Sequence, residues 1–274
     1  MSNVPADSTV EAANAGRREQ RPLHLLVTAG PTREKIDEVR DWGNIFTGKT
    51  GLDLALAFLE LGSVTLLTSN EGHAREFDGY SGKGGMLGAE VFHSHAELRG
   101  LLEERMTSGD RVDVVAMTAA VADYSPRAVY RVVERREENP KAESRNPNGG
   151  KGREMWVVEE VSAPKVKSVF DEIAVLGGRT EKLVDLFRTK WAFRGALIKF
   201  KLEVGLTDEE LIRVASASRV ASGADLMVAN TLAMARPSGG EGAAYLIDGN
   251  GAARVGRREL AGRIVGWVRG ALRR

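Results

Sequence analysis

The octapeptide GNIFTGKT at residues 43–50 matches the pattern G-x-x-x-x-G-K-[ST], in which backbone N–H groups and a lysine bind nucleotide phosphates. A working loop of that type follows a buried strand directly. Here the preceding segment EKIDEVRDW is too charged for a buried strand, and the apolar run LHLLVTAG already ends at Gly30. We therefore predict that the match is not a phosphate loop of the type that directly follows a buried strand. Gly48 still opens a helix, and the N-terminus of a helix favours an anion.

The composition excludes several other kinds of chemistry. The chain of 274 residues contains no cysteine, so disulfides, thiolate metal sites and a cysteine nucleophile are ruled out. A formal net charge of +1 gives no overall attraction to nucleic acid or to a membrane surface. No apolar run reaches the roughly 20 residues of a membrane span. We expect a cytoplasmic protein that binds neither nucleic acid nor membrane.

Strand-like and helix-like segments alternate along the chain. Short apolar runs typical of strands lie at 23–30, 63–70, 112–124, 195–203, 224–232 and 243–248. Helical spacing of apolar residues, or a capping box such as Thr207 with Glu210, occurs at 51–62, 96–106, 181–187, 207–223 and 258–272. This alternation predicts an α/β fold with a Rossmann-like, doubly wound, mostly parallel sheet and helices on both of its faces.

The domain organisation follows from changes in composition. Residues 1–20 are small and polar without apolar periodicity, which predicts a disordered N-terminal arm. Residues 21–274 are predicted to form a single α/β domain. Within it, the segment of about 127–163 is crowded with charges and with Asn, Pro and Gly, so we expect an inserted β-hairpin or flap there.

A longer constellation of motifs includes the octapeptide. The stretch VTAGPTREKIDEVRDWGNIFTGKTG at 27–51 resembles the opening motif of phosphopantothenate–cysteine ligases, T-A-G-x-T-R-E-x-I-D-x-V-R followed by N-x-S-S-G-x-x-G. Four later segments are similar to further motifs of that family, in the same order: AAVADY at 119–124, PKVKS at 164–168, KFKLE at 199–203 and ADLMVAN at 224–230. The chain thus resembles a stand-alone, divergent member over roughly residues 22–272.

The resemblance implies an enzyme of coenzyme A biosynthesis. Such a ligase activates the carboxylate of 4'-phosphopantothenate with a nucleoside triphosphate, CTP or ATP, and joins it to cysteine through an amide bond. It implies Mg²⁺ as cofactor and a homodimer, and no flavin, because the flavin-dependent decarboxylase fused to some relatives has no counterpart in this sequence. The implied catalytic residues are Asn44 and Lys165, and Asp123 is implied to bind the metal. The nucleotide-binding residues that it implies are Gly30, Thr32, Thr47, Gly48, Ala119, Ala120, Asp123, Phe200 and Lys201.

Several departures from the family pattern leave alternatives open. Phe46 and Thr47 stand where the family has two serines, and Ser218 and Ser222 stand where bacterial members often have lysines that contact the triphosphate. Lys167 competes with Lys165 as the site lysine. A non-catalytic nucleotide-binding protein on the same fold is one alternative function. An NAD(P)-dependent Rossmann reductase is another, although TAGPTRE lacks G-x-G-x-x-G and the segment 63–70 ends in an asparagine rather than an acid.

Two further features have ordinary structural explanations. His93 and His95 would share one face of a strand, as metal ligands can, but no third ligand lies near them in the sequence, which favours surface histidines. The arginines of the C-terminal helix flank an apolar stripe, so they are interpreted as its solvated face.

Overall fold

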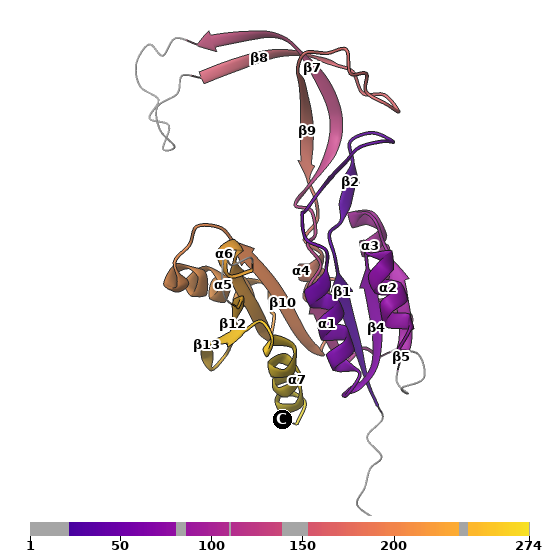
Figure 1. The fold of residues 1–274 in the computed structure, drawn as a ribbon, viewed down its shortest axis with the longest axis vertical. Helices are drawn as coiled ribbons and strands as arrows, with labels where there is room; N and C mark the ends of the chain where they lie inside the picture. Colours follow the sequence, from indigo (N-terminus) through magenta and orange to yellow (C-terminus); the bar gives the residue numbers. More distant parts are fainter. Residues whose placement is uncertain (1–21, 81–85, 110, 139–152, 236–240, 274) are drawn as a thin grey trace, which may run out of the picture.

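A computed structural model describes residues 22–80, 86–109, 111–138, 153–235 and 241–273 of the chain. It has an α/β core from which a β-sheet arm projects (Figure 1). The predicted disordered arm at 1–20 lies outside the described residues. None of the described helices combines the length and the apolar composition that a membrane span requires.

The core is built on one eight-stranded sheet in the order β13-β12-β11-β10-β6-β1-β4-β5. Its strands are β1 (Leu23–Ala29), β4 (Gly62–Thr68), β5 (Met86–Val91), β6 (Val114–Met117), β10 (Ala196–Glu203), β11 (Leu226–Thr231), β12 (Ala243–Asp248) and β13 (Gly251–Gly256). Strand β12 is antiparallel to both of its neighbours, β11 and β13, and the other neighbouring strands of this sheet pair in parallel. From β1 the chain winds outward through β4 to β5 and then returns to β6 on the other side, so the topological switch point lies between β1 and β6.

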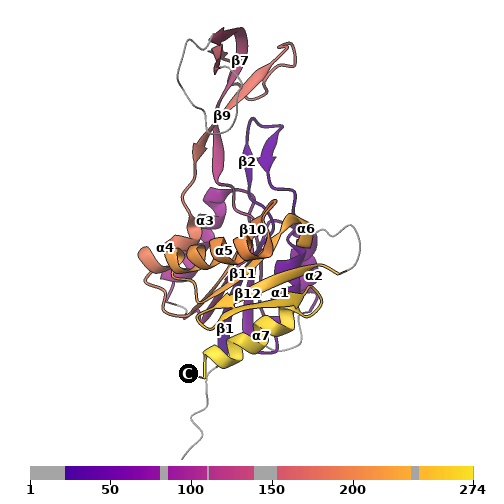
Figure 2. The same cartoon turned by 90° about the vertical axis from the view of Figure 1, so that its left-hand side faces the viewer.

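Helices cover both faces of this sheet (Figures 1 and 2). One layer contains α1 (Lys49–Phe58), α2 (Glu71–Asp78) and α7 (Leu260–Ala271), and the other contains α3 (His95–Thr107), α4 (Leu183–Thr189) and α5 (Asp208–Ser222). The short α6 (Leu232–Ala235) follows β11. Side chains of β1 alternate between the layers: Leu25 and Val27 pack with α1 and α7, and Leu26 packs with α3 and α4. The predicted doubly wound, mostly parallel α/β fold is confirmed.

The arm is a separate three-stranded antiparallel sheet in the order β8-β7-β9. Its strands are β7 (Tyr124–Glu138), β8 (Arg153–Glu160) and β9 (Ile173–Arg179). The first two lie in the segment where the sequence suggested a hairpin or flap, and its central residues 139–152 are outside the described residues. A small hairpin of β2 (Arg33–Lys35) and β3 (Asp41–Gly43) stands beside the base of the arm (Figure 1).

A buried carboxylate links that hairpin to the loop between β8 and β9. Asp37 accepts backbone hydrogen bonds from Val39 at 2.9 Å, Arg40 at 2.8 Å and Val166 at 3.1 Å, and its side chain is fully buried. The Arg40 guanidinium also binds the carboxylate, and together these donors hold the pKa of Asp37 well below its usual range. The Asp37 carboxylate therefore connects the turn of the β2–β3 hairpin to the loop between β8 and β9.

The structure corrects the sequence reading in several short elements. The strands β2, β3, β5, β9 and β13 and the helix α2 were not predicted, because each is short and most are partly exposed. His93 and His95 do not lie on a strand: Ser94 is the N-cap of α3, which begins at His95. Neither imidazole is part of a metal-ligand cluster within the described residues.

Candidate functional site

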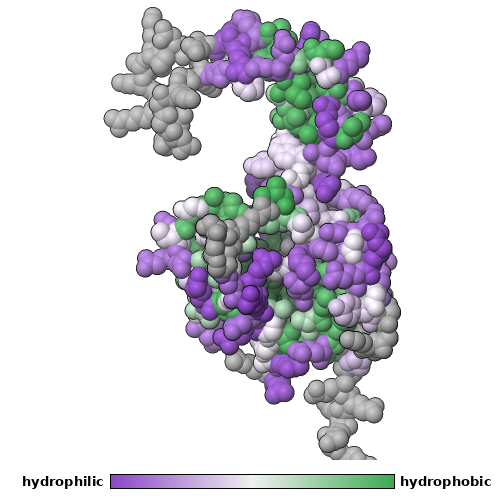
Figure 3. All heavy atoms as spheres, viewed as in Figure 1, coloured by the Kyte–Doolittle hydropathy of each residue, from purple (hydrophilic) through white to green (hydrophobic). Residues whose placement is uncertain are grey.

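A cavity of about 690 Å³ opens at the carboxyl ends of the central strands, where the core is hollowed below the arm (Figure 3). Open α/β sheets bind ligands at this edge, next to the switch point. The cavity is lined by the loop and helix start at 44–51, the loop after β6 at 117–123, the start of α4 at 180–184 and the end of β10 at 199–202. One or two residues each of α5, β11, α6, β12 and α7, together with Arg257, complete the lining. The sequence thus brings distant segments together around one space.

Two glycines let the start of α1 pack onto the end of β1. Gly48 is the N-cap of α1 with φ of +87°, and a Cβ there would lie 2.4 Å from the backbone nitrogen of Gly30. A Cβ on Gly51 would lie 2.3 Å from Thr118 Oγ1. Only residues without a side chain allow these approaches, and they place the first turn of α1 on the pocket wall.

The octapeptide at 43–50 does not directly follow a strand of the eight-stranded sheet. Gly43 ends β3, an exposed three-residue strand of the small hairpin, as the charged sequence before it indicated. Lys49, the lysine of the pattern, forms an ion pair with Asp53 at 2.8 Å, and this hydrogen bond raises the pKa of Lys49. Its charge is therefore already balanced within α1.

The loop after β6 is fixed by hydrogen bonds to the end of β1. The backbone nitrogen of Ala119 donates to Thr28 Oγ1 at 3.1 Å, and that of Ala120 donates to the Gly30 carbonyl at 3.0 Å. The nitrogen of Ala122 donates to Oγ1 of the fully buried Thr32 at 2.9 Å. Because these N–H groups are occupied, the loop offers the pocket its carbonyl groups and side chains rather than these donors.

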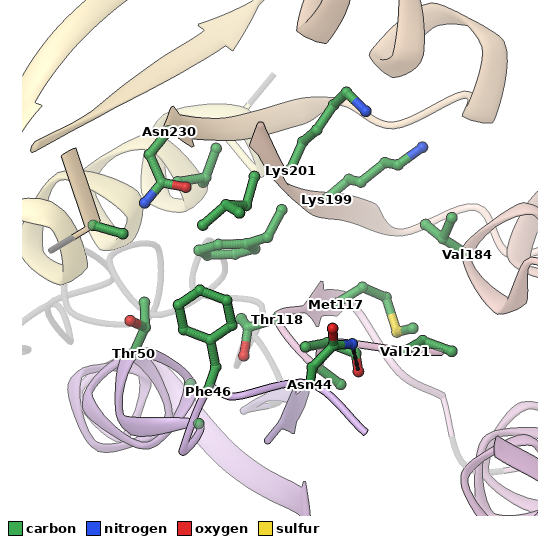
Figure 4. Close-up of a pocket in the computed structure, with 18 of the residues that line it drawn as sticks. Asn44, Phe46, Thr50, Met117, Thr118, Val121, Val184, Lys199, Lys201 and Asn230 are labelled. Atoms are coloured by element: carbon green, nitrogen blue, oxygen red, sulfur yellow. Dashed lines mark hydrogen bonds between the residues drawn. The ribbon is translucent and has the colours of Figure 1, made fainter. Parts of the chain in front are cut away.

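Asn44 lines the cavity from the loop that precedes α1. Its Nδ2 donates to the Ala120 carbonyl oxygen at 3.0 Å, which fixes the side chain against the loop after β6. Figure 4 shows Asn44 on the same side of the pocket as Val121, with Phe46 projecting toward the middle of the pocket. An amide nitrogen has two hydrogens, so one donor of Asn44 remains for a ligand.

Asp123 lines the same pocket and is exposed to solvent. No group of three or more His, Cys, Asp or Glu side chains in the described ranges is arranged to hold a metal ion. Mg²⁺ commonly takes only one or two carboxylates and completes its shell with water and substrate phosphates. Asp123 and Glu181 are exposed carboxylates that line the cavity, and Glu181 is bonded to Arg99 at 2.9 Å, so Asp123 is the carboxylate that fits this coordination habit.

The other residues implied by the family resemblance divide into two groups. Thr47, Gly48, Ala119, Ala120, Phe200 and Lys201 line the cavity. Gly30, Thr32, Lys165 and Lys167 do not: the first two support the loop after β6 from behind. Lys165 is exposed on the loop between β8 and β9, where the neighbouring Pro164 carbonyl accepts a hydrogen bond from Glu38. This arrangement does not bring either lysine to the pocket of its own chain.

Sequence reasoning missed Lys182 and Lys199, which also line the cavity. A signal for Lys199 was present, because strand alternation puts it on the same face of β10 as Lys201. Of the two serines that replace family lysines, Ser218 lines the pocket and contacts Lys199, with 3.0 Å between its Oγ and Lys199 Nζ. Ser222 is buried and donates to the Ser218 carbonyl of its own helix.

The strand order and the position of the cavity define a doubly wound α/β protein with its ligand site at the switch point. Residues 21–143 match the family "DNA/pantothenate metabolism flavoprotein C-terminal domain". The match confirms the resemblance drawn from the motifs.

Known proteins extend the similarity beyond that region. The "Coenzyme A biosynthesis bifunctional protein CoaBC" of Thermococcus kodakarensis is 29% identical over 245 residues, which are 88% of this chain and 49% of that protein. The chain spans about half the length, or less, of the curated relatives it matches.

Solved structures share the fold. The DNA/pantothenate metabolism flavoprotein of Streptococcus pneumoniae matches with a TM-score of 0.66 and 23% identity, covering 91% of this chain and 99% of that one. A Cab2 mutant in complex with phosphopantothenate-cysteine matches with a TM-score of 0.57 and 14% identity, covering 92% of this chain and 86% of that one.

Proposed function

We propose that this chain is a phosphopantothenate–cysteine ligase of coenzyme A biosynthesis, which activates the substrate carboxylate with a nucleoside triphosphate. The observation that carries the proposal is the Asn44 amide, bonded to the Ala120 carbonyl oxygen at the edge of a cavity formed by the start of α1 and the loop after β6. The family match and the names of the relatives support the same activity.

The proposed reaction has two steps that share one pocket. In the first, a carboxylate oxygen of 4'-phosphopantothenate attacks the α-phosphorus of CTP or ATP, and pyrophosphate leaves. In the second, the cysteine amine attacks the acyl carbon, the nucleoside monophosphate leaves, and the ammonium that forms loses a proton. Holding both reactants in one crevice removes much of the entropic barrier.

Asn44 acts where charge develops during the second step. Its remaining amide hydrogen donates to the acyl-phosphate oxygens as the tetrahedral centre forms, while the bond to Ala120 keeps the donor oriented. Removing one such preorganised donor costs roughly 2.7 to 4 kcal/mol of barrier. Gly48 and the first turn of α1 add backbone N–H groups on the same wall of the cavity.

Asp123 is the residue that would hold Mg²⁺. When bound, the ion neutralises phosphate charge and orients the triphosphate. Asp123 follows a loop whose backbone is hydrogen-bonded to Gly30 and Thr32, so the backbone that carries its carboxylate is held in place. Thr47, Ala119, Ala120 and Phe200 form the neighbouring walls that would bind the nucleoside.

A homodimer in the cytoplasm is part of the proposal. The strands of the arm expose apolar side chains, among them Met155, Trp156 and Val158, which a second copy would cover. The mass of the purified chain, measured by light scattering, tests this point independently of activity.

The test of the function is a coupled assay on the purified chain with Mg²⁺. Pyrophosphate release from CTP or ATP should require phosphopantothenate, and amide formation should require cysteine in addition. Consumption of NADPH would point to a reductase instead. Nucleotide binding without turnover would point to a non-catalytic protein on the same fold.

A further inference from the structure

Three lysines lie together on one side of the cavity. Lys199 and Lys201 are two residues apart on β10, so they lie on the same face of the sheet, and Lys182 is the N-cap of α4 on that face. Figure 4 shows the Lys199 and Lys201 side chains extending from β10 with both ammonium groups on the same side of the pocket. β6 ends at Met117, opposite Lys199, and this opens the space into which the pair extends.

Lys199 differs from Lys201 and Lys49 in its surroundings. Lys201 forms an ion pair with Glu203 at 2.8 Å, and Lys49 forms one with Asp53. The Nζ of Lys199 instead donates to the Ser218 hydroxyl at 3.0 Å, and no carboxylate of the described residues lies within ion-pair distance of it. Lys199 is therefore a half-buried cation with a neutral partner.

Burial and charge both make this arrangement unfavourable without a ligand. Burial is the main cause that lowers the pKa of Lys199; the charge of Asp185 opposes it, and the smaller effects of Lys182 and Lys201 lower the pKa further. A partly desolvated ammonium without a counter-ion is stabilised strongly by an anion that replaces its lost hydration. A polyphosphate carries several charges, so it would neutralise Lys199 and could also contact Lys182 and Lys201 beside it.

We infer that the phosphate chain of the nucleotide binds along β10 and the start of α4, with Lys199 as its central contact and Ser218 as the residue that positions Lys199. This inference rests on the proposed function and names the site of its triphosphate. It also explains why a serine can stand at position 218: Lys199 on β10 supplies the cation of the pocket, and the Ser218 side chain of α5 orients it. The lysine at the start of α1 is already neutralised within its own helix.

The test uses inorganic tripolyphosphate as the probe, with and without Mg²⁺, in a titration calorimeter and without phosphopantothenate. Lys199→Met removes the ammonium and keeps the chain length, whereas Lys35→Met is the matched control, because Lys35 is exposed on β2 and does not line the cavity. We expect Lys199→Met to weaken binding about tenfold to a hundredfold, the range for a hydrogen bond to a charged group. Ser218→Ala should weaken it less, and Lys35→Met should bind like the unaltered protein.

Kinetics separate this inference from the function on which it rests. In the ligase assay, Lys199→Met should raise the KM for the nucleotide and leave the KM for phosphopantothenate unchanged. If ligase activity is absent but tripolyphosphate binding still depends on Lys199, the site assignment stands and the proposed function fails. If Lys199→Met binds tripolyphosphate like the unaltered protein, or if the Lys35→Met control loses as much affinity, the inference is overturned. Thermal unfolding of each variant verifies that it is folded.

Discussion

The side-chain amide of Asn44 and the main-chain carbonyl of Ala120 are joined by a hydrogen bond of 3.0 Å between Nδ2 and the oxygen. Asn44 belongs to the loop before α1, and Ala120 belongs to the loop after β6. The bond therefore links the two loops that line the pocket beside the switch point of the sheet. The same Ala120 carbonyl accepts from the Thr32 nitrogen at 3.2 Å, so both loops are anchored to the extension of β1.

Replacing Asn44 by aspartate should separate binding from amide formation. The carboxylate cannot donate to the Ala120 carbonyl, and it cannot donate to an acyl-phosphate. We expect nucleotide binding to persist and the rate of amide formation to fall about 10²- to 10³-fold, as for loss of one oxyanion donor. Single-turnover measurements of pyrophosphate and amide should show the first without the second. Asn250→Asp, in the exposed turn between β12 and β13, is the matched control, and an equal loss there would remove the special role of Asn44.

Adding one methyl group at Gly48 should destabilise the protein. The backbone φ of +87° is unfavourable for alanine, and its Cβ would meet Gly30. We expect the free energy of unfolding to fall by at least about 1 to 3 kcal/mol, the cost of a strained backbone residue. In contrast, Gly266→Ala lies in the exposed interior of α7 with open space around it and should stabilise by about 0.5 to 1 kcal/mol. Urea denaturation measures both, and a neutral Gly48→Ala would contradict the close approach of α1 to β1.

The central half of the fold was predictable because its signals are local. The apolar runs of β1, β4 and β11 are bounded by polar or small residues, and the capping box at Thr207 is present where α5 begins. The elements that were missed depend on distant partners. β5 is a strand because it pairs with β4, and β9 is one because it pairs with the first half of β7. Such pairings cannot be read from segments of six or seven residues.

The candidate site was predictable to a similar extent. Motif similarity implied Asn44, Gly48 and Asp123, which line one cavity. It gave no information on which residues point into the cavity and which support it from behind, and Thr32 proves to be a fully buried support. Lys199 lies outside the residues that the motif similarity implied, although strand periodicity places it on the same face of β10 as Lys201.

The buried carboxylate of Asp37 should control how firmly the loop between β8 and β9 is held. Asp37→Asn replaces an acceptor by an amide that opposes the donors of Arg40 and Val166. We expect faster hydrogen exchange in peptides that contain residues 161–170, measured by mass spectrometry. Glu38→Gln, an exposed neighbour whose backbone makes the Pro164 bond, is the control and should exchange like the unaltered protein.

The pH dependence of this contact follows from the lowered pKa of Asp37. A carboxyl whose native pKa lies below its ordinary value of 3.8 stabilises the fold above 3.8, and this contribution is lost as the pH falls through the native value. Protection of residues 161–170, corrected for intrinsic exchange rates, should therefore be equal at pH 7 and pH 5. A loss of protection between these values would show that the carboxylate is not held as described.

Proton uptake should accompany triphosphate binding at alkaline pH. Burial lowers the pKa of Lys199 from the ordinary 10.5 in the free protein; Asp185 opposes this shift, and Lys182 and Lys201 add smaller effects in the direction of burial. An anion at the ammonium raises that pKa again, so between the two values the complex binds more protons than the free protein. Phosphate groups have a second pKa of about 6, so they are already ionised in this range and take up no protons. Calorimetry in two buffers of different ionisation enthalpy measures the uptake; Lys199→Met should abolish it, and uptake that persists in this variant would assign the titration to another group.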